Sequence, residues 1–394
     1  MSAASKKGVD RRAMGVLSSG HLFTDLNQGA VAALLPFLIS ERGLSLAAAG
    51  ALVFAATVSS SLVQPLFGIF SDRNPIPALM PLGVLLAGAG MALVGVAPSY
   101  PLIFASVVVS GVGVAAFHPE AARFANYVSG ARRARGMSFF SVGGNAGFAF
   151  GPLVTTPLVL AFGLPGTLFL VLPAALMAGV MFAETSRMLR LAPEQAANRS
   201  QEVEAPPESW GPFAVMIAVV AVRSFVYFGL VAFVASYYDR VHGESAALGN
   251  VALTVMLAAG AVGTLFMGPL ADRFGRKAVL AWSMLVLPPL VLAFAFVGPY
   301  PGMVMLALIG AATVGTFGVT VVMGQEYLPG RIGLAAGITV GLSIGLGGIG
   351  APLLGLLADV GGLRTAMLAI AALPVLGLVL SLTLPARTRA FGGT

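Results

Sequence analysis

The sequence is poor in charged residues and has no cysteine. Only 9% of its 394 residues are Asp, Glu, Lys or Arg, whereas soluble globular proteins carry about 25%. Without cysteine, disulfides, thiolate metal sites and lipidated cysteines are excluded. Histidine occurs only three times, and there is no Walker-type phosphate-binding loop. We therefore expect neither an enzyme nor a user of ATP, and we expect no metal site among the histidines and no cofactor.

Long apolar runs fill most of the chain, in which 58% of residues are hydrophobic and the mean hydropathy is +0.94. A transmembrane helix needs roughly 20 apolar residues. The runs are too long and too continuously apolar for barrel strands, which alternate over about ten residues. We therefore predict an all-α polytopic membrane protein. Its twelve predicted helices lie near residues 13–39, 46–70, 78–97, 101–124, 136–161, 164–184, 211–237, 246–270, 278–298, 301–325, 332–358 and 363–384.

Positive charge is distributed unequally between the two sides of the predicted membrane. With a cytoplasmic N-terminus, 18 of the 22 Lys and Arg residues fall in cytoplasmic segments and three fall outside. This bias is the positive-inside pattern of membrane proteins. It explains the net charge of +7 without nucleic acid, which we exclude as a partner. The lipid bilayer is the expected partner, and both termini are predicted to be cytoplasmic.

One motif occurs twice, 200 residues apart. The first copy contains Gly68, Asp72 and Arg73, and the second contains Gly268, Asp272 and Arg273. An internal repeat in a polytopic chain predicts two similar halves around a pseudo-symmetric cavity, as in secondary transporters. We expect twelve transmembrane helices in two six-helix bundles. The predicted parts are a cytoplasmic tail at 1–12, a bundle at 13–186, a polar cytoplasmic linker at 187–209, a second bundle at 210–386 and a tail at 387–394.

The first predicted helix carries a polar stripe that includes a carboxyl group near mid-span. Ser18, His21, Thr24, Asp25 and Gln28 fall within an arc of about 120° at 100° per residue. A charge at the bilayer centre costs several kcal/mol unless it faces protein or water, so the stripe marks the side that faces a cavity. Because burial disfavours the charged carboxylate, Asp25 is a candidate proton carrier. The alternative is a hydrogen-bonded structural Asp.

The fourth predicted helix ends in a second group of ionisable side chains. Pro119 removes one backbone hydrogen bond and bends the helix. Glu120 and Arg123 are placed to pair at i,i+3, while His118 points elsewhere. The ordinary pKa of histidine, near 6.5, suits His118 to proton relay, although a structural histidine is the alternative. Asp25, His118 and Glu120 are thus the candidates for proton coupling.

The seventh predicted helix carries Arg223 near mid-span, with Tyr227 on the same face. Two alternatives remain open for Arg223. It is either the counter-ion of Asp25 across a shared cavity or a bidentate ligand for an anionic substrate. Asn145, near the middle of the fifth helix, is a further polar contact. The candidate substrate-binding residues are His21, Gln28, Asn145, Arg223 and Tyr227.

The second copy of the repeated motif is the more complete one, since Gly275, Arg276 and Lys277 extend it to G-x-x-x-D-R-x-G-R-K. The first copy departs after Arg73, where Asn74-Pro75-Ile76-Pro77 follows. The full pattern is similar to the signature of the major facilitator superfamily, in which it caps cytoplasmic helix ends. The resemblance implies a gating role for Gly68, Asp72, Arg73, Gly268, Asp272, Arg273, Gly275, Arg276 and Lys277.

Further segments make the chain resemble the bacterial fosmidomycin-resistance branch of that superfamily. They are Gly20-His21 with Asp25, Ser59 to Gly68, Phe117-His118-Pro119-Glu120-Ala121-Ala122-Arg123, Val142 to Gly147, and Arg223 to Gly229. The resemblance implies the major facilitator fold and efflux of a small molecule by proton antiport, with antibiotic resistance as the outcome. It also implies a multi-pass protein of the bacterial inner membrane, which we expect to be a monomer. Fosmidomycin is an anionic phosphonate, and Arg223 suits such a ligand.

Two other functions fit the sequence. An uptake symporter for an organic acid or a sugar would have a similar fold and site but the opposite direction of coupling. A membrane sensor or scaffold that transports nothing would have no need for Asp25. Three observations distinguish these functions. Deletion of an exporter causes drug sensitivity, and deletion of an uptake symporter causes loss of growth on a carbon source. A sensor or scaffold shows no proton flux.

Overall fold

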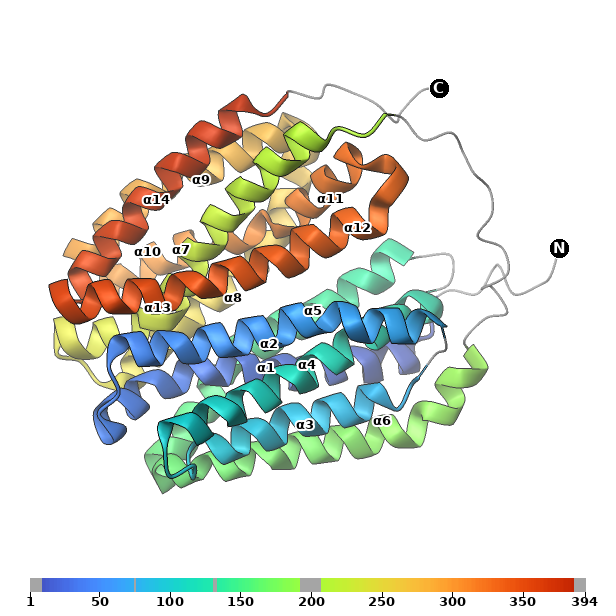
Figure 1. Cartoon of the computed structure of the whole chain (residues 1–394), viewed down its shortest axis with the longest axis horizontal. Helices are drawn as coiled ribbons and strands as arrows, with labels where there is room; N and C mark the ends of the chain where they lie inside the picture. Colours follow the sequence, from blue (N-terminus) through green and yellow to red (C-terminus); the bar gives the residue numbers. More distant parts are fainter. Residues whose placement is uncertain (1–8, 74–75, 130–132, 192–206, 386–394) are drawn as a thin grey trace. The chain divides into compact units, whose positions relative to one another are not determined.

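The computed structural model describes residues 9–73, 76–129, 133–191 and 207–385. Within these ranges the regular elements are all helices (Figure 1). The first seven are α1 (Arg11–Arg42), α2 (Leu46–Arg73), α3 (Leu79–Val94), α4 (Tyr100–Val128), α5 (Arg133–Phe162), the 3₁₀ turn η2 (Leu164–Leu170) and α6 (Val171–Leu191). After the linker come α7 (Trp210–His242), α8 (Ala246–Phe274), α9 (Arg276–Phe296), α10 (Pro299–Gly315), α11 (Phe317–Tyr327), η4 (Pro329–Arg331), α12 (Ile332–Gly337), η5 (Ile338–Leu342), α13 (Ser343–Gly361) and α14 (Leu363–Thr383).

In the described part of the chain, 11 helical spans are long and apolar enough to cross a membrane, and α3 is a shorter apolar helix. One of these spans, Pro299–Tyr327, joins α10 and α11. The prediction of an all-helical, multi-pass membrane fold is confirmed. The short α3 lies between two prolines, since it begins after Pro77 and ends at Val94, before Pro98. The residue before a proline is biased away from helical geometry.

Contacts divide the chain into two compact units. The first comprises residues 1–34 and 55–203, and the second comprises 35–54 and 204–394. Residues 35–54, which lie within the predicted first bundle, group with the second unit. Asp359 of α13 contributes to this grouping, because its carboxylate accepts hydrogen bonds from the backbone N–H groups of Leu46 (2.8 Å) and Ala47 (2.9 Å). These N–H groups begin α2 and have no partner within their own helix.

In the first unit, α3 packs against α4 and α6 around a core of apolar side chains. Small residues bring the backbones of α3 and α4 close together. A Cβ added at Gly90 would lie 2.5 Å from the amide nitrogen of Ser110, and one at Gly83 would lie 2.7 Å from the carbonyl oxygen of Gly113. Such contacts are the usual means of helix packing in lipid, so these glycines fix the helix frame of the first unit.

In the second unit, α14 packs against α7 and α9, α10 against α8, and α13 against α7. Two predicted continuous helices are interrupted. The run at 301–325 divides into α10 and α11 at Thr316, and the run at 332–358 contains the π-helical segment η5. Thr313 and Thr316 donate their hydroxyls to carbonyls of the preceding turn. Threonine back-bonding of this kind bends helices, which gives the first interruption a physical cause.

Candidate functional site

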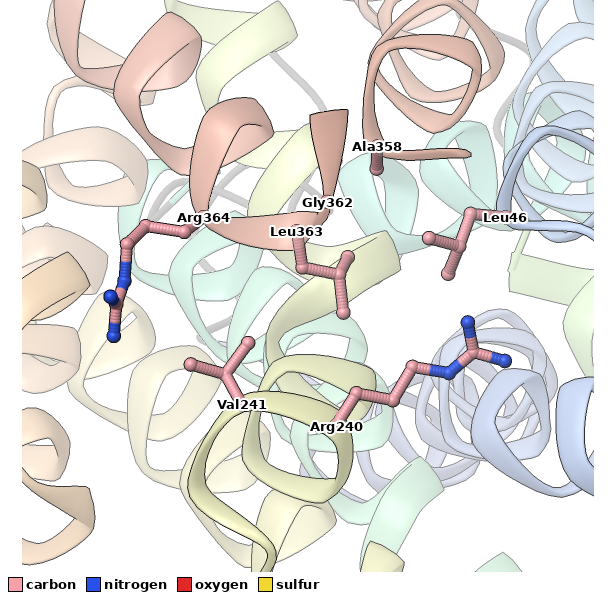
Figure 2. Close-up of a pocket in the computed structure, with 7 residues that line it drawn as sticks. All are labelled: Leu46, Arg240, Val241, Ala358, Gly362, Leu363 and Arg364. Carbon is pink, nitrogen blue, oxygen red and sulfur yellow. The ribbon is translucent and has the colours of Figure 1, made fainter. Parts of the chain in front are cut away.

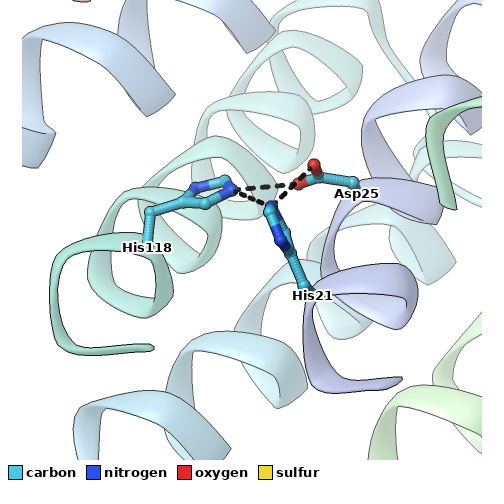
Figure 3. A group of neighbouring side chains, drawn as sticks. All are labelled: His21, Asp25 and His118. Carbon is cyan, nitrogen blue, oxygen red and sulfur yellow. Dashed lines mark hydrogen bonds and ion pairs between the residues drawn. The ribbon is translucent and has the colours of Figure 1, made fainter. Parts of the chain in front are cut away.

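Three ionisable side chains of the first unit meet inside the membrane-spanning helices. His21 and Asp25 come from α1 and His118 comes from α4 (Figure 3). The Nε2 atoms of the two histidines lie 3.1 Å apart. Each Nε2 also lies 3.2 Å from a carboxylate oxygen of Asp25, His21 from Oδ2 and His118 from Oδ1. The three side chains are only 11–20% exposed, so they form one mostly buried His–Asp–His cluster.

The opposite ring nitrogens of the two histidines are held by backbone carbonyls. His21 Nδ1 lies 2.8 Å from the carbonyl oxygen of Phe140, and His118 Nδ1 lies 3.0 Å from that of Val114. A carbonyl only accepts, so both Nδ1 atoms carry the hydrogen. In the neutral tautomers both Nε2 lone pairs therefore face each other and the carboxylate. Four acceptor atoms then face one another, and a proton or another cation shared between them relieves their repulsion.

Helix α5 leaves the space that this cluster occupies. A Cβ added at Gly144 would lie 2.4 Å from His21 Nε2 and 2.7 Å from Asp25 Oδ2. Its neighbours Gly143 and Gly147 bring α5 against the α1 backbone, because a Cβ there would lie 2.2 Å and 2.1 Å from carbonyl oxygens of α1. The ring of Phe140 stacks on His21 with centroids 4.1 Å apart. The glycine-rich middle of α5 thus forms the third wall of the cluster.

Glu120, a sequence candidate for proton coupling, lies elsewhere. Its side chain is fully buried and accepts a hydrogen bond of 2.8 Å from the backbone N–H of Ile76, next to α3. Arg123 lies 3.6 Å away on the same helix, as the i,i+3 spacing predicts. In the second unit, Glu326 similarly accepts from Arg276 at the start of α9, at 2.6 Å. Glu120 thus binds the connection that follows the first copy of the repeated motif, and Glu326 binds an arginine of the second copy.

Arg223 of the second unit is 4% exposed and lies against the interruption between α10 and α11. Its Nη1 donates to the hydroxyl of Thr316 at 3.1 Å and approaches that of Thr320 at 3.5 Å. The guanidinium also lies over the ring of Phe317, 5.7 Å from its centroid. Among the residues that the structure describes, no carboxylate pairs with it. Asp25 and Arg223 each have their polar neighbours within their own unit.

The remaining predicted substrate contacts are partly buried. Gln28 follows Asp25 on α1, and Asn145 directly follows Gly144 on α5. Tyr227 lies one turn after Arg223 on α7, with its ring edge-on to Phe228. His21, which we expected among the substrate contacts, lies in the cluster with Asp25. The sequence did not reveal that His21 and His118 meet. We expected no metal-ligand group among the histidines, whereas His21, Asp25 and His118 lie close enough together to hold an ion.

A cavity of about 470 Å³ lies in the second unit, at the ends of helices (Figure 2). It adjoins the end of α7, the end of α13 and the start of α14. Arg240 and Arg364 line it, but their guanidinium groups point away from each other on opposite sides of Leu363. They do not converge on a ligand, so this cavity is a poor candidate for substrate binding.

Comparison with known proteins decides the family. The profile of the Major Facilitator Superfamily matches residues 17–260 and 216–392. The chain belongs to the major facilitator superfamily. This membership agrees with the two helical units and the apolar spans described above, and it makes the chain a transporter of the multi-pass membrane class.

Two curated members of the superfamily are similar to this transporter over most of their length. An uncharacterized MFS-type transporter, YfnC of Bacillus subtilis, is 35% identical over 93% of this chain and 90% of its own. The fosmidomycin resistance protein of Escherichia coli is 31% identical over 93% of this chain and 91% of its own. The predicted resemblance to the fosmidomycin-resistance branch is confirmed.

Solved structures of transporters have the same fold at low sequence identity. A bacterial homologue of the human lysosomal transporter Spinster, inward-facing and occupied, aligns with a TM-score of 0.77 and 18% identity, over 96% of this chain and 97% of its own. A D-xylose-proton symporter aligns with a TM-score of 0.73 and 14% identity, over 95% and 97%. At these identities the likeness concerns the major facilitator fold alone.

The repeated motif of this major facilitator adopts a defined geometry in its second copy. Gly275 ends α8 and precedes α9 with φ of +91°, a conformation that favours glycine. Arg276 lies 3.9 Å from Asp272, and Lys277 donates to the carbonyl of Leu382 at 2.8 Å. In the first copy, Gly68, Asp72 and Arg73 belong to the last turns of α2, and their side chains, like residues 74–75, lie outside the described part.

Proposed function

We propose that this major facilitator exports small anionic compounds in exchange for protons, by alternating access. It works in the bacterial inner membrane with both termini in the cytoplasm. Identity of 31% to the fosmidomycin resistance protein supports this direction and this substrate class. The His21–Asp25–His118 cluster is the observation that carries the proton role, and Arg223 supports the preference for an anion.

The cluster suits proton binding because its atoms need a shared positive charge. With both Nδ1–H groups donating to carbonyls, a proton on either Nε2 is the natural bridge between the two rings and Asp25. Protonation also neutralises the carboxylate, whose charge is costly within a bilayer. Uptake and release of a proton thus change the charge of α1 and α4 at mid-membrane, which is what coupling requires.

Arg223 is a buried cation whose described partners are two hydroxyls and an aromatic ring. Buried charges in proteins are normally paired, and a guanidinium matches a phosphonate or carboxylate bidentately. Arg223 therefore binds the anionic group of the substrate, with Tyr227 one turn along α7. Asn145 and Gln28, both partly buried, are further proposed substrate contacts.

Glu120 has a different role from the proton carriers. Its carboxylate is bound to the N–H of Ile76 and lies near Arg123. We assign Glu120 to holding the connection after the first copy of the motif, and Glu326 to holding Arg276 of the second copy. This connection and the motif residues regulate the opening of the transporter, while the proton binds at Asp25 with His118 and His21.

Reconstituted protein under an imposed pH gradient tests the proposal. Phosphonates, cationic drugs, organic acids and sugars are compared as substrates, in vesicles with the cytoplasmic face outward. The expected result is accumulation of phosphonates that needs the pH gradient and that weakens in Arg223→Ala and Arg223→Lys. Unchanged substrate affinity in both variants would overturn the role of Arg223. Uptake of a sugar or an organic acid together with protons would contradict export and would show that the protein is a symporter.

A further inference from the structure

The His21–Asp25–His118 cluster also has the composition of a transition-metal site. We propose that these three side chains bind one divalent transition-metal ion, with zinc as the best match, and that the bound ion blocks the proton step. The proposed binding of the metal ion is argued from geometry alone, whereas the proposed inhibition of proton transfer rests on the proposed function. Nothing else in the described part brings two imidazoles and a carboxylate together.

The distances between the ligand atoms fit a tetrahedral ion. Zinc binds imidazole nitrogen and carboxylate oxygen at roughly 2.0–2.2 Å, so neighbouring ligand atoms in a tetrahedral site lie about 3.3 Å apart. The two Nε2 atoms lie 3.1 Å apart, and each lies 3.2 Å from a carboxylate oxygen. The two histidines contact different oxygens of Asp25, and one ligand atom from each of the three residues lies within 4.8 Å of the others. A rotation of the carboxylate therefore brings one oxygen onto a zinc face with both Nε2 atoms.

The hydrogen bonds around the histidines favour metal binding as well. Metal-binding histidines usually donate their other ring N–H to a carbonyl or carboxylate, which fixes the ring and the tautomer. Here the carbonyls of Phe140 and Val114 accept from Nδ1 of His21 and of His118. Both Nε2 lone pairs are thus presented to the same point before any ion arrives.

The α5 backbone beside the site presents no side chain that would compete for it. Gly144 faces His21 and Asp25 without a side chain, and a Cβ there would come within 2.4 Å of Nε2. The ligand side chains are 11–20% exposed, which leaves a path for entry. Imidazole suits zinc, copper, nickel and iron, whereas magnesium and calcium prefer all-oxygen sites. A proton and a metal ion need the same lone pairs, so they exclude each other.

Zinc binding to the purified full-length chain tests the site directly. The protein carries a purification tag without histidine, and a chromogenic chelator competes for Zn²⁺. We expect one Zn²⁺ per chain, and at least about tenfold weaker binding in His21→Ala, Asp25→Asn and His118→Ala, since even second-shell changes cost 10–100-fold. His242→Ala is the matched control, because the third histidine lies at the end of α7. Binding that is absent, or equal in all variants, overturns the site.

X-ray absorption spectroscopy of zinc-loaded wild-type protein identifies the ligand atoms directly. It therefore tests the site even if a variant fails to fold. We expect two imidazole nitrogens and one or two oxygens at roughly 2.0–2.2 Å. A shell of oxygen alone contradicts the site.

Transport measured with and without Zn²⁺ separates this inference from the proposed function. We expect Zn²⁺ to abolish pH-gradient-driven transport and a chelator to restore it. Zinc that binds but leaves transport unchanged overturns the block. A chain that binds zinc but shows no proton-coupled transport contradicts the proposed function and leaves the metal site intact.

Discussion

His21 and His118 face each other with their Nε2 atoms 3.1 Å apart, although 97 positions separate them in the chain. Each ring is fixed from behind by a backbone carbonyl, and Asp25 spans both Nε2 atoms. This arrangement cannot be satisfied by neutral histidines and a carboxylate alone. A shared proton or a metal ion supplies the missing positive charge, and the proposed function assigns the proton to this place.

Gly144→Ala is expected to disrupt this arrangement although it replaces no ionisable residue. The new Cβ would lie 2.4 Å from His21 Nε2, and overpacking of this kind costs roughly 1–3 kcal/mol. We expect at least a tenfold loss of pH-gradient-driven transport in a protein that still folds. Gly15→Ala on α1 is the control, because a Cβ there meets nothing within 4 Å. Equal transport in the two variants would contradict the account of α5.

Thr316→Val is expected to weaken binding of the anionic substrate. The change removes the hydroxyl that accepts from Arg223 Nη1 at 3.1 Å. A hydrogen bond to a charged group contributes about 1.5–3 kcal/mol, so the KM for a phosphonate should rise by roughly tenfold or more. Thr313→Val is the matched control, since that hydroxyl donates only to carbonyls of its own helix. A KM that is the same in both variants would show that Thr316 does not position Arg223.

The stability of the first unit is expected to depend on pH through Asp10, which precedes α1. Burial raises the pKa of Asp10, but the hydrogen bond from Ala13 N–H and the charge of Arg187 outweigh it and lower the pKa below 3.8. Since the folded pKa is the lower one, the carboxylate stabilises the fold above pH 3.8. That contribution is lost as the pH falls through the folded pKa.

Thermal unfolding of Asp10 variants between pH 3 and pH 7 measures this effect. Asp10→Ala removes both the helix cap and the ion pair and should cost about 1–2 kcal/mol at pH 7. Asp10→Asn keeps a capping side chain and loses the charge, so its cost should be smaller. The gap between wild type and Asp10→Asn should close below pH 3.8. A gap that is constant with pH would exclude the ion pair as its source.

The sequence was sufficient to predict the helical membrane fold. The apolar runs and the motif shared by Asp72 and Asp272 predict helical spans in two similar halves, because run length and repeats are local signals. The four-residue spacing of His21 and Asp25 correctly predicts that both lie on one helix face. The pairing of Glu120 with Arg123 follows from the same rule.

The contacts between side chains of different helices could not be predicted from the sequence. The meeting of His21 with His118 depends on how closely α1, α4 and α5 pack, which in turn depends on Gly144. The glycine-rich run predicts close packing but not which side chains it exposes to each other. The binding of Glu120 to Ile76 N–H and that of Arg223 to Thr316 likewise follow from tertiary contacts.

Transport by Asp25→Asn protein in proteoliposomes tests the central claim most directly. Asparagine keeps the size of the side chain but cannot exchange a proton at physiological pH. We predict that an imposed pH gradient no longer drives phosphonate accumulation, while phosphonate binding, measured separately at equilibrium, is retained. Accumulation against a gradient at the wild-type rate would contradict the assignment of the proton to the cluster of His21, Asp25 and His118.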